Sequence, residues 1–318
     1  NAVVLFVNRN YTKTLKQLQA KRKHNKQNKK KDENKKCFLR KGDFVMEEKK
    51  YKVLSIGAHP DDADTSAGGL LCKLKAKGWD VRLLSLTDGS AGTYDIERSG
   101  QKLVEIRKKE AAASGVLLGG RYDVWDLPDA RLTASIENRE RLIRYIRECD
   151  PDLIITNRPG DYHPDHRNTA LLVADASYLL TVPTVCSDVK PMEVMPVILY
   201  WADDFERPYP CQPDVVVPID GYEESLLQLA CCHESQYFDW MYWPDRMDHT
   251  DWPREKQVGE LRARYLRNGR SNRDYTEKQL IEQLGEERAA EVKAVQYFEV
   301  CEFGEPLTEE LRKVLVEP

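Results

Sequence analysis

Apolar runs alternate with amphipathic segments through most of the chain. Six short apolar runs predict strands, at residues 51–58, 80–89, 122–127, 152–159, 195–201 and 214–220. Between them, apolar residues recur at helical spacing and predict helices over residues 64–77, 103–118, 136–149, 168–180 and 222–241. Such alternation is typical of a parallel sheet that helices cover on both faces. We therefore predict an α/β fold with a mostly parallel sheet, which binds its ligand at the carboxyl ends of the strands.

Two segments depart from this pattern. Residues 21–36 carry no apolar side chain, which predicts a disordered or solvated segment. We assign residues 1–45 to a basic, disordered tail and residues 46–318 to the main domain. The boundary is placed at Met46 because the sequence from this residue resembles an ordinary protein N-terminus. The favoured interpretation gives the tail no functional role, and an arm that binds RNA or a membrane surface is the alternative. Residues 243–290 are polar, rich in Trp and Arg, and predict a helical insertion that ends in a charged helix over 276–290.

Charge and cysteine usage narrow the class of protein. The tail carries eleven Lys and three Arg against three acidic residues, whereas the whole chain has a net charge of −4. The main domain is therefore acidic, which argues against binding of nucleic acid. We find no run of 18 apolar residues and predict no membrane span. The eight cysteines form no C-x-x-C pair, which predicts reduced thiols in a soluble, cytoplasmic protein.

Histidines and carboxylates gather after two predicted strands. The clusters are AHPDDAD (58–64), after the first strand, and DYHPDH (161–166), after the fourth. Carboxylates so close together repel one another unless a positive charge such as a divalent metal lies among them. Two imidazoles and one carboxylate predict a catalytic zinc site with an open position for water, and the same donors accept Fe²⁺. Either cluster alone could be helix capping, but both fall on the same edge of the sheet.

Other enzyme classes lack their motifs. We find no G-x-S-x-G elbow and no G-x-G-x-x-G turn, which disfavours a serine hydrolase and a nicotinamide-dependent enzyme. Five motifs occur in order between about residues 52 and 180, namely AHPDDAD, LTDGSAG, RKKEAAASGVLLG, LPDARL and RPGDYHPDH. Together they resemble the PIG-L/LmbE family of zinc-dependent de-N-acetylases. The resemblance implies a Rossmann-like fold and removal of the acetyl group from N-acetylglucosamine carried on another moiety, such as phosphatidylinositol, inositol or malate.

The resemblance also implies a metal site and a partner. It makes His59, Asp62 and His166 the zinc ligands, with zinc-bound water attacking the amide. The expected partner is a small-molecule amino-sugar conjugate, and a homo-oligomer is possible in this family. Two alternatives stay open: an amidase that acts on a larger sugar or thiol conjugate, and a catalytically silent sugar-binding protein on the same fold. Retention of Asp61 with all three ligands favours an enzyme.

Further residues receive roles by their positions in the family motifs. The resemblance implies that Asp61 is the general base. It implies that His163 stabilises the oxyanion and helps to protonate the leaving amine, and that Asp165 orients His163. Arg107 is a candidate substrate contact, with an exposed helix arginine as the alternative. His233, in CCHESQ, is either a substrate contact or a hydrogen-bonded structural histidine.

Overall fold

The computed structural model describes residues 50–318, with the exception of 244–245, 248, 250 and 318. Residues 50–318 form one compact unit. The predicted tail over 1–45 and the domain start at residue 46 lie outside the described residues, so these two boundaries stay predictions.

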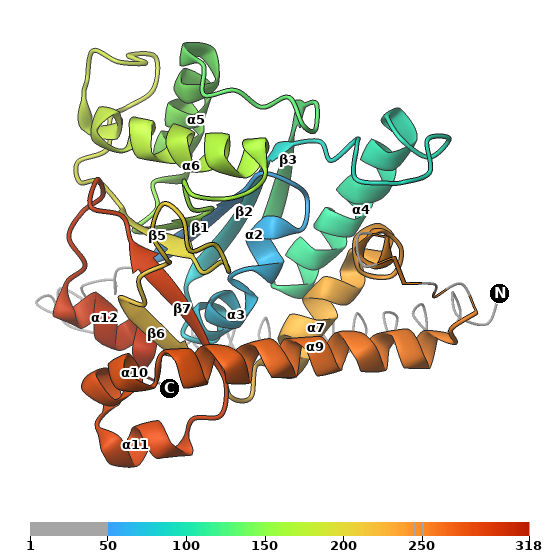
Figure 1. The fold of residues 1–318 in the computed structure, drawn as a ribbon. Coiled ribbons are helices and arrows are strands. Elements are labelled where there is room, and N and C mark those ends of the chain that lie inside the picture. Colours follow the sequence, from blue (N-terminus) through green and yellow to red (C-terminus); the bar gives the residue numbers. More distant parts are fainter. Residues whose placement is uncertain (1–49, 244–245, 248, 250, 318) are drawn as a thin grey trace, which may run out of the picture. The chain divides into compact units, whose positions relative to one another are not determined.

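A seven-stranded sheet in the order β3-β2-β1-β4-β5-β7-β6 forms the centre of this unit (Figure 1). Strands β1 to β5 pair in parallel, and β7 lies antiparallel between β5 and β6. This confirms the six predicted strands and the mostly parallel sheet. The strands span Lys52–Gly57 (β1), Asp80–Thr87 (β2), Arg121–Leu127 (β3), Leu153–Thr156 (β4), Val197–Trp201 (β5), Val215–Pro218 (β6) and Val295–Val300 (β7).

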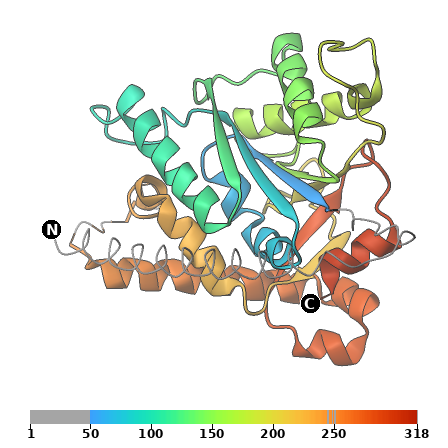
Figure 2. The same ribbon diagram turned by 180° about the vertical axis from the view of Figure 1, so that it is seen from behind.

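Helices cover both faces of the sheet, as predicted. One core packs α5 and α6 against the sheet, and the other packs α3, α4, α7 and α12 against the opposite face (Figures 1 and 2). The helices span Asp62–Thr65 (α2), Gly68–Ala76 (α3), Gln101–Leu117 (α4), Ile136–Cys149 (α5), Pro164–Ser177 (α6), Glu223–Cys232 (α7), Glu234–Tyr237 (α8), Arg254–Tyr275 (α9), Glu277–Leu284 (α10), Glu286–Glu291 (α11) and Glu309–Val316 (α12).

Three predicted helices are divided in the structure, and the one expected over 64–77 is divided between α2 and α3. The helix expected over 222–241 ends at His233, whose ψ of 64° leaves the helical region and separates α7 from α8. The helix expected over 276–290 breaks at Gly285, where a φ of +80° favours glycine. The predicted insertion is dominated by α9, which packs Leu261 into a small core with Leu227 of α7. Within the described residues, no helix is long and apolar enough to cross a membrane.

Candidate active site

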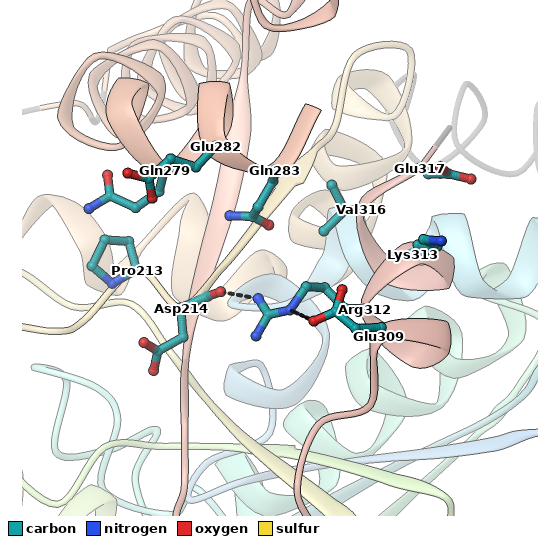
Figure 3. Close-up of a pocket in the computed structure, with 10 residues that line it drawn as sticks. All are labelled: Pro213, Asp214, Gln279, Glu282, Gln283, Glu309, Arg312, Lys313, Val316 and Glu317. Carbon is teal, nitrogen blue, oxygen red and sulfur yellow. Dashed lines mark hydrogen bonds and ion pairs between the residues drawn. The ribbon is translucent and has the colours of Figure 1, made fainter. Parts of the chain in front are cut away.

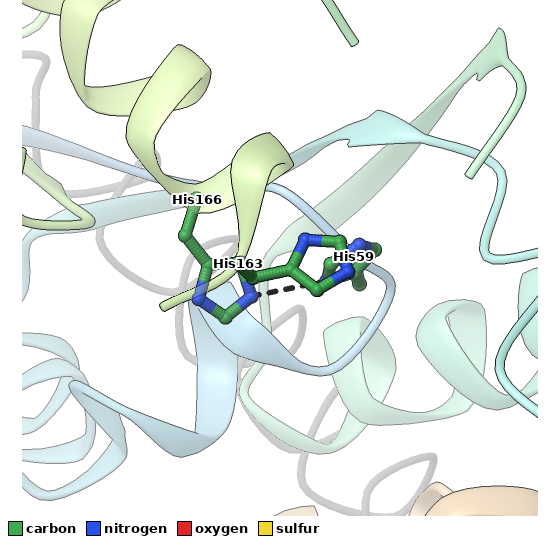
Figure 4. A group of neighbouring side chains, drawn as sticks. All are labelled: His59, His163 and His166. Carbon is green, nitrogen blue, oxygen red and sulfur yellow. Dashed lines mark hydrogen bonds between the residues drawn. The ribbon is translucent and has the colours of Figure 1, made fainter. Parts of the chain in front are cut away.

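The two sequence clusters meet where β1 and β4 end. These strands are neighbours and run in parallel, so their carboxyl ends lie at the same edge of the sheet. The chain after β1 carries His59, and the chain after β4 leads into α6, which carries His166. The two rings approach each other across this edge, with His59 Nδ1 3.1 Å from His166 Nε2 (Figure 4). The expectation that both clusters share one edge is therefore confirmed.

Asp62 completes a compact set of donor atoms. Its Oδ2 lies 3.5 Å from His59 Nδ1 and 3.5 Å from His166 Nε2. Ligand atoms that surround a zinc ion tetrahedrally at 2.0–2.1 Å are separated from one another by about 3.4 Å. The triangle formed by these three atoms therefore has the size and the donor chemistry that a zinc ion requires.

Two other groups of side chains offer donor atoms within 4.8 Å of one another. One replaces Asp62 by His163, and the other joins His59 to Asp129 and Asp165. In the first group, His163 Nδ1 accepts a hydrogen bond from the Asp165 amide at 3.1 Å, so Nε2 is the nitrogen that His163 can offer to a metal. In the second group, both carboxylates lie on the Nε2 side of His59, away from the atom that faces His166. The donor atoms of the set with Asp62 lie 3.1–3.5 Å apart, and Asp62 Oδ2 also accepts from the Ala58 and His59 amides.

Carboxylates lie beside the outer ring nitrogens of His59 and His166. His59 Nε2 lies 3.2 Å from Asp129 Oδ1 and 3.4 Å from Asp165 Oδ2. His166 Nδ1 lies 2.9 Å from Asp161 Oδ2. A carboxylate at one ring nitrogen favours a proton there and leaves the lone pair of the other nitrogen for a metal. Both imidazoles are therefore oriented for a cation between them.

The charges of the site also favour a cation. Burial opposes protonation of His59, but hydrogen bonds to Asp129 and Asp165 outweigh it and raise the pKa of His59 well above its usual value. The pKa of His166 is raised too, because the nearby Asp62 charge overcomes burial. Burial would raise the pKa of Asp62, but His166 and His59 bring it below the usual range. The negative potential that attracts protons here would equally attract a divalent ion.

Asp61 is held by a buried arginine. The Arg107 side chain is 2% exposed, and its Nη2 donates to Asp61 Oδ1 at 2.6 Å. The guanidinium also donates to the carbonyl oxygens of Pro60 and Gly89, each at 3.3 Å. Burial raises the pKa of Asp61, and the Arg107 charge opposes this shift. The alternative of an exposed helix arginine is wrong, and Arg107 is placed to orient Asp61.

The structure assigns different atoms to the contact between Asp165 and His163. His163 precedes α6, and its Nδ1 accepts a hydrogen bond from the backbone amide of Asp165. The Asp165 carboxylate accepts from the amides of Ala130, at 2.7 Å, and Leu132, at 3.1 Å. Its carboxylate also lies 3.4 Å from His59 Nε2, so Asp165 orients His163 through its backbone amide and not through its carboxylate. Because Nδ1 accepts, a neutral His163 carries its proton on Nε2.

Sequence reasoning missed two supporting carboxylates. Asp129 lies after β3, is 8% exposed, and also accepts from the Ala91 amide at 3.2 Å. Burial alone would raise the pKa of Asp129, but hydrogen bonding to His59 lowers it to about 2. Asp161 precedes His163 by two residues and accepts from its amide at 2.8 Å. Asp129 could have been found, because it follows a predicted strand within the quoted motif LPDARL.

A buried hydrogen-bond network surrounds Asp64, three residues after Asp61. His233 Nε2 lies 2.6 Å from Asp64 Oδ2, and neither side chain is exposed. Ser114, on α4, donates to the same Asp64 oxygen. Ser235 donates to Glu110, also on α4, through its amide at 2.8 Å and its hydroxyl at 2.7 Å. The junction of α7 and α8 therefore braces α2 and α4, which supports the structural interpretation of His233.

A pocket of about 500 Å³ lies at the other end of the strands. It opens beside Asp214, which precedes β6, and between α10 and α12 (Figure 3). Arg312, on α12, donates to the Asp214 carbonyl oxygen and is one of several charged residues in the lining. Because β6 begins where this pocket lies, the pocket is at the amino edge of the strand and away from the histidines. It has no part in the site at the carboxyl edge.

Comparisons with known proteins agree with the motifs and the geometry. The family model described as "PIG-L: GlcNAc-PI de-N-acetylase" matches residues 54–177. The diacetylchitobiose deacetylase of Thermococcus kodakarensis is 32% identical over 226 residues, which cover 67% of this chain and 82% of that protein. The structure of N,N'-diacetylchitobiose deacetylase from Pyrococcus horikoshii aligns with a TM-score of 0.61 at 26% identity, over 79% of this chain and 84% of that one.

A relative of different function is also similar. The 4-oxalmesaconate hydratase of Pseudomonas putida is 23% identical over 199 residues, which cover 60% of this chain and 76% of that protein. The deacetylase match is higher in identity and longer, and the fold alone does not decide the reaction. With the ordered motifs and the site they build, these similarities show that the chain belongs to the PIG-L family.

Proposed function

We propose that this protein is a zinc-dependent de-N-acetylase that hydrolyses the N-acetyl amide of an N-acetylglucosamine conjugate. The observation that carries this proposal is the triangle of donor atoms from His59, Asp62 and His166, with sides of 3.1–3.5 Å. When bound, zinc would lower the pKa of a water molecule to about 7 and polarise the acyl oxygen. Fe²⁺ is the alternative metal, because this donor set suits both.

Asp61 is the proposed general base. Its Oδ1 is fixed by Arg107, so its carboxylate can keep one orientation towards the attacking water. Burial raises the pKa of Asp61 and brings it nearer to neutral pH, where a base is most effective. Asp61 accepts a proton from water as the C–O bond forms, and it returns that proton to the amine nitrogen as the C–N bond breaks. The products are acetate and the free amino sugar.

His163 is the proposed donor to the developing oxyanion. Burial and the neighbouring histidines lower the pKa of His163, which favours its neutral form. With Nδ1 occupied by the Asp165 amide, the proton of the neutral ring is on Nε2 and can be donated to an oxygen. In this assignment, His163 donates a hydrogen bond to the oxyanion, and Asp61 supplies the proton to the leaving amine.

The acetylated sugar is proposed to carry a second group. Relatives of this chain are named as deacetylases of diacetylchitobiose and of an acetamido-deoxyglucopyranoside of inositol, which supports a small amino-sugar conjugate. The larger-amide and silent-protein alternatives are not favoured by these similarities. A cytoplasmic location, a homo-oligomeric state and the lack of a nucleic-acid partner stay predictions.

Acetate release with a metal assay on the same sample tests the proposal. The substrates would be N-acetylglucosamine, N,N'-diacetylchitobiose and N-acetylglucosaminyl inositol. We expect acetate from at least one conjugate, loss of release with a chelator, and recovery with zinc. A fully metal-loaded protein that releases no acetate would contradict the proposal. Hydration of 4-oxalmesaconate by the same sample would then assign it to the other activity named among its relatives.

A further inference from the structure

Two exposed aromatic rings lie beside the site histidines. The Tyr162 ring centroid is 5.7 Å from the His163 ring and 5.7 Å from the His166 ring. The Tyr162 ring centroid is also 5.8 Å from the Phe205 ring. Tyr162 is 68% exposed and Phe205 is 36% exposed. Tyr162 therefore contacts both the site histidines and Phe205.

A buried arginine fixes the loop that carries Phe205. Arg158 follows β4, is 1% exposed, and lies 2.5 Å from Asp203 Oδ1. Its Nη2 donates to the Tyr209 carbonyl at 2.8 Å, and Asp203 Oδ1 accepts from the Phe205 amide at 3.0 Å. Glu299, on β7, lies 3.5 Å from Arg158 Nε. Burying this guanidinium costs desolvation, so its pairing with both ends of the loop holds Phe205 in a set position.

The backbone at Tyr162 is fixed as well. Arg167 Nη1 donates to the carbonyl oxygens of Asp161, at 2.9 Å, and Tyr162, at 2.8 Å. The Tyr162 side chain nevertheless stays largely exposed. An exposed ring on a fixed backbone loses little conformational entropy when a ligand packs against it.

The chemistry of this surface suits a sugar ring. Exposed apolar surface is costly in water, and large exposed rings that line a polar site are typical of ligand contacts. Pyranose and cyclitol rings have polar edges and apolar C–H faces, and these faces pack on aromatic rings. With ring centroids 5.8 Å apart, Tyr162 and Phe205 could each contact one of two successive rings of a substrate whose amide lies at the histidines.

We infer that Tyr162 and Phe205 form an aromatic platform that binds two consecutive rings of the substrate. Tyr162 packs against the acetylated sugar, and Phe205 packs against the first ring of the carrier group. The inference rests on the proposed function and deepens it, because it makes the carrier a sugar or cyclitol ring. Phe205 is then a specificity-determining residue, and Tyr162 serves every substrate.

Paired substrates test the platform. We would compare Phe205→Ala and Tyr162→Ala with Tyr178→Ala, a control that is also 68% exposed but lies beyond the other end of α6. Phe205→Ala should lower kcat/KM for N,N'-diacetylchitobiose about five- to tenfold through KM, and leave N-acetylglucosamine unchanged. Tyr162→Ala should lower kcat/KM for both substrates, and Tyr178→Ala for neither. Phe205→Trp and Tyr162→Phe should retain activity, because each keeps an aromatic ring.

The outcomes separate this inference from the proposed function. Equal losses on both substrates with Phe205→Ala, or no loss on the disaccharide, would overturn the platform while leaving deacetylation intact. Wild-type protein that releases no acetate at all would refute the proposed function instead. In that case, calorimetric binding of N,N'-diacetylchitobiose decides: weaker binding to Phe205→Ala than to wild type supports the platform, and equal or absent binding overturns it. Metal content and circular dichroism confirm that each variant is folded.

Discussion

At the scale of single residues, ring orientation decides which histidine nitrogens can bind a metal. His59 presents Nδ1 to the centre because two carboxylates take Nε2, and His166 presents Nε2 because Asp161 takes Nδ1. His163 differs, because a backbone amide takes its Nδ1. His163 and His166 of the HPDH motif therefore have different proposed roles, as oxyanion donor and as metal ligand.

Replacement of His163 and of His166 should separate these two roles. We expect His166→Ala to lose most of its metal on dialysis, because one of three ligands is gone. His163→Ala should keep its metal and lose about 100- to 1,000-fold in kcat, as expected when an oxyanion donor is removed. Metal analysis by mass spectrometry and acetate release would measure both. Loss of metal from His163→Ala as well as from His166→Ala would instead favour the three-histidine set.

Removal of the charge at Asp61 should lower turnover without removing the metal, and it should also lower stability because the buried Arg107 loses its charged partner. Asp61→Asn keeps the size of the side chain but cannot accept a proton from water. We expect kcat to fall about 100- to 10,000-fold with metal content unchanged. Asp126→Asn, at an exposed carboxylate paired with Arg141, is the matched control and should behave as wild type. Activity of Asp61→Asn within twofold of wild type would remove the base assignment.

At the scale of elements, the sequence predicted where the strands end but not what packs behind them. The runs before His59 and His163 are apolar and end in polar motifs, so periodicity alone placed both motifs at the carboxyl edge. Strand β7 was missed, because its buried Glu299 interrupts the apolar pattern in order to pair with Arg158. Arg107 and His233 could not be interpreted either, since their partners are distant in the chain and only tertiary packing joins them.

The close contact between β1 and α2 should make Gly57 essential for the metal site. A Cβ at Gly57 would lie 2.5 Å from Asp62 Cβ and 2.9 Å from the Ala63 amide nitrogen. We expect Gly57→Ala to displace Asp62, to lower bound metal and to cost about 1–3 kcal/mol in the free energy of unfolding. In Gly259→Ala, on α9, the added Cβ would meet nothing within 4 Å. That control should be neutral or slightly stabilising, and equal metal content in both variants would contradict the argument.

The buried hydrogen bonds that the α7–α8 junction makes with Asp64 and Glu110 should contribute to stability. His233→Ala leaves the Asp64 carboxylate buried beside Ser114 without its imidazole partner. We expect the free energy of unfolding to fall by about 3–5 kcal/mol in urea denaturation, as for other broken buried ion pairs. Lys190→Ala removes one partner of an exposed pair, with Glu193, and should change stability by less than about 0.5 kcal/mol. Equally small changes in the free energy of unfolding of both variants would show that the contact between His233 and Asp64 contributes little to stability.

At the scale of the whole molecule, the site joins segments that are distant along the chain. The proposed ligand atoms come from the segments that follow β1 and β4, and the hydrogen bond from His233 to Asp64 comes from the α7–α8 junction. The seven-stranded sheet brings the segments after β1 and β4 together, because adjacent parallel strands end at the same edge. A metal that binds all three ligands therefore holds together parts of the fold that separate on unfolding.

Metal removal should for this reason lower thermal stability as well as activity. A ligand that binds only the folded protein adds about 2.7 kcal/mol at 100 times its Kd, which corresponds to roughly 5–10 °C in Tm for a domain of this size. We expect chelation to lower Tm by that amount, zinc to restore it, and Asp62→Asn to lose most of the shift. His163→Ala should keep the full shift, because it retains all three ligands. A zinc-dependent Tm that survives in Asp62→Asn and disappears in His163→Ala would move the metal to the three histidines and require a new assignment of the oxyanion donor.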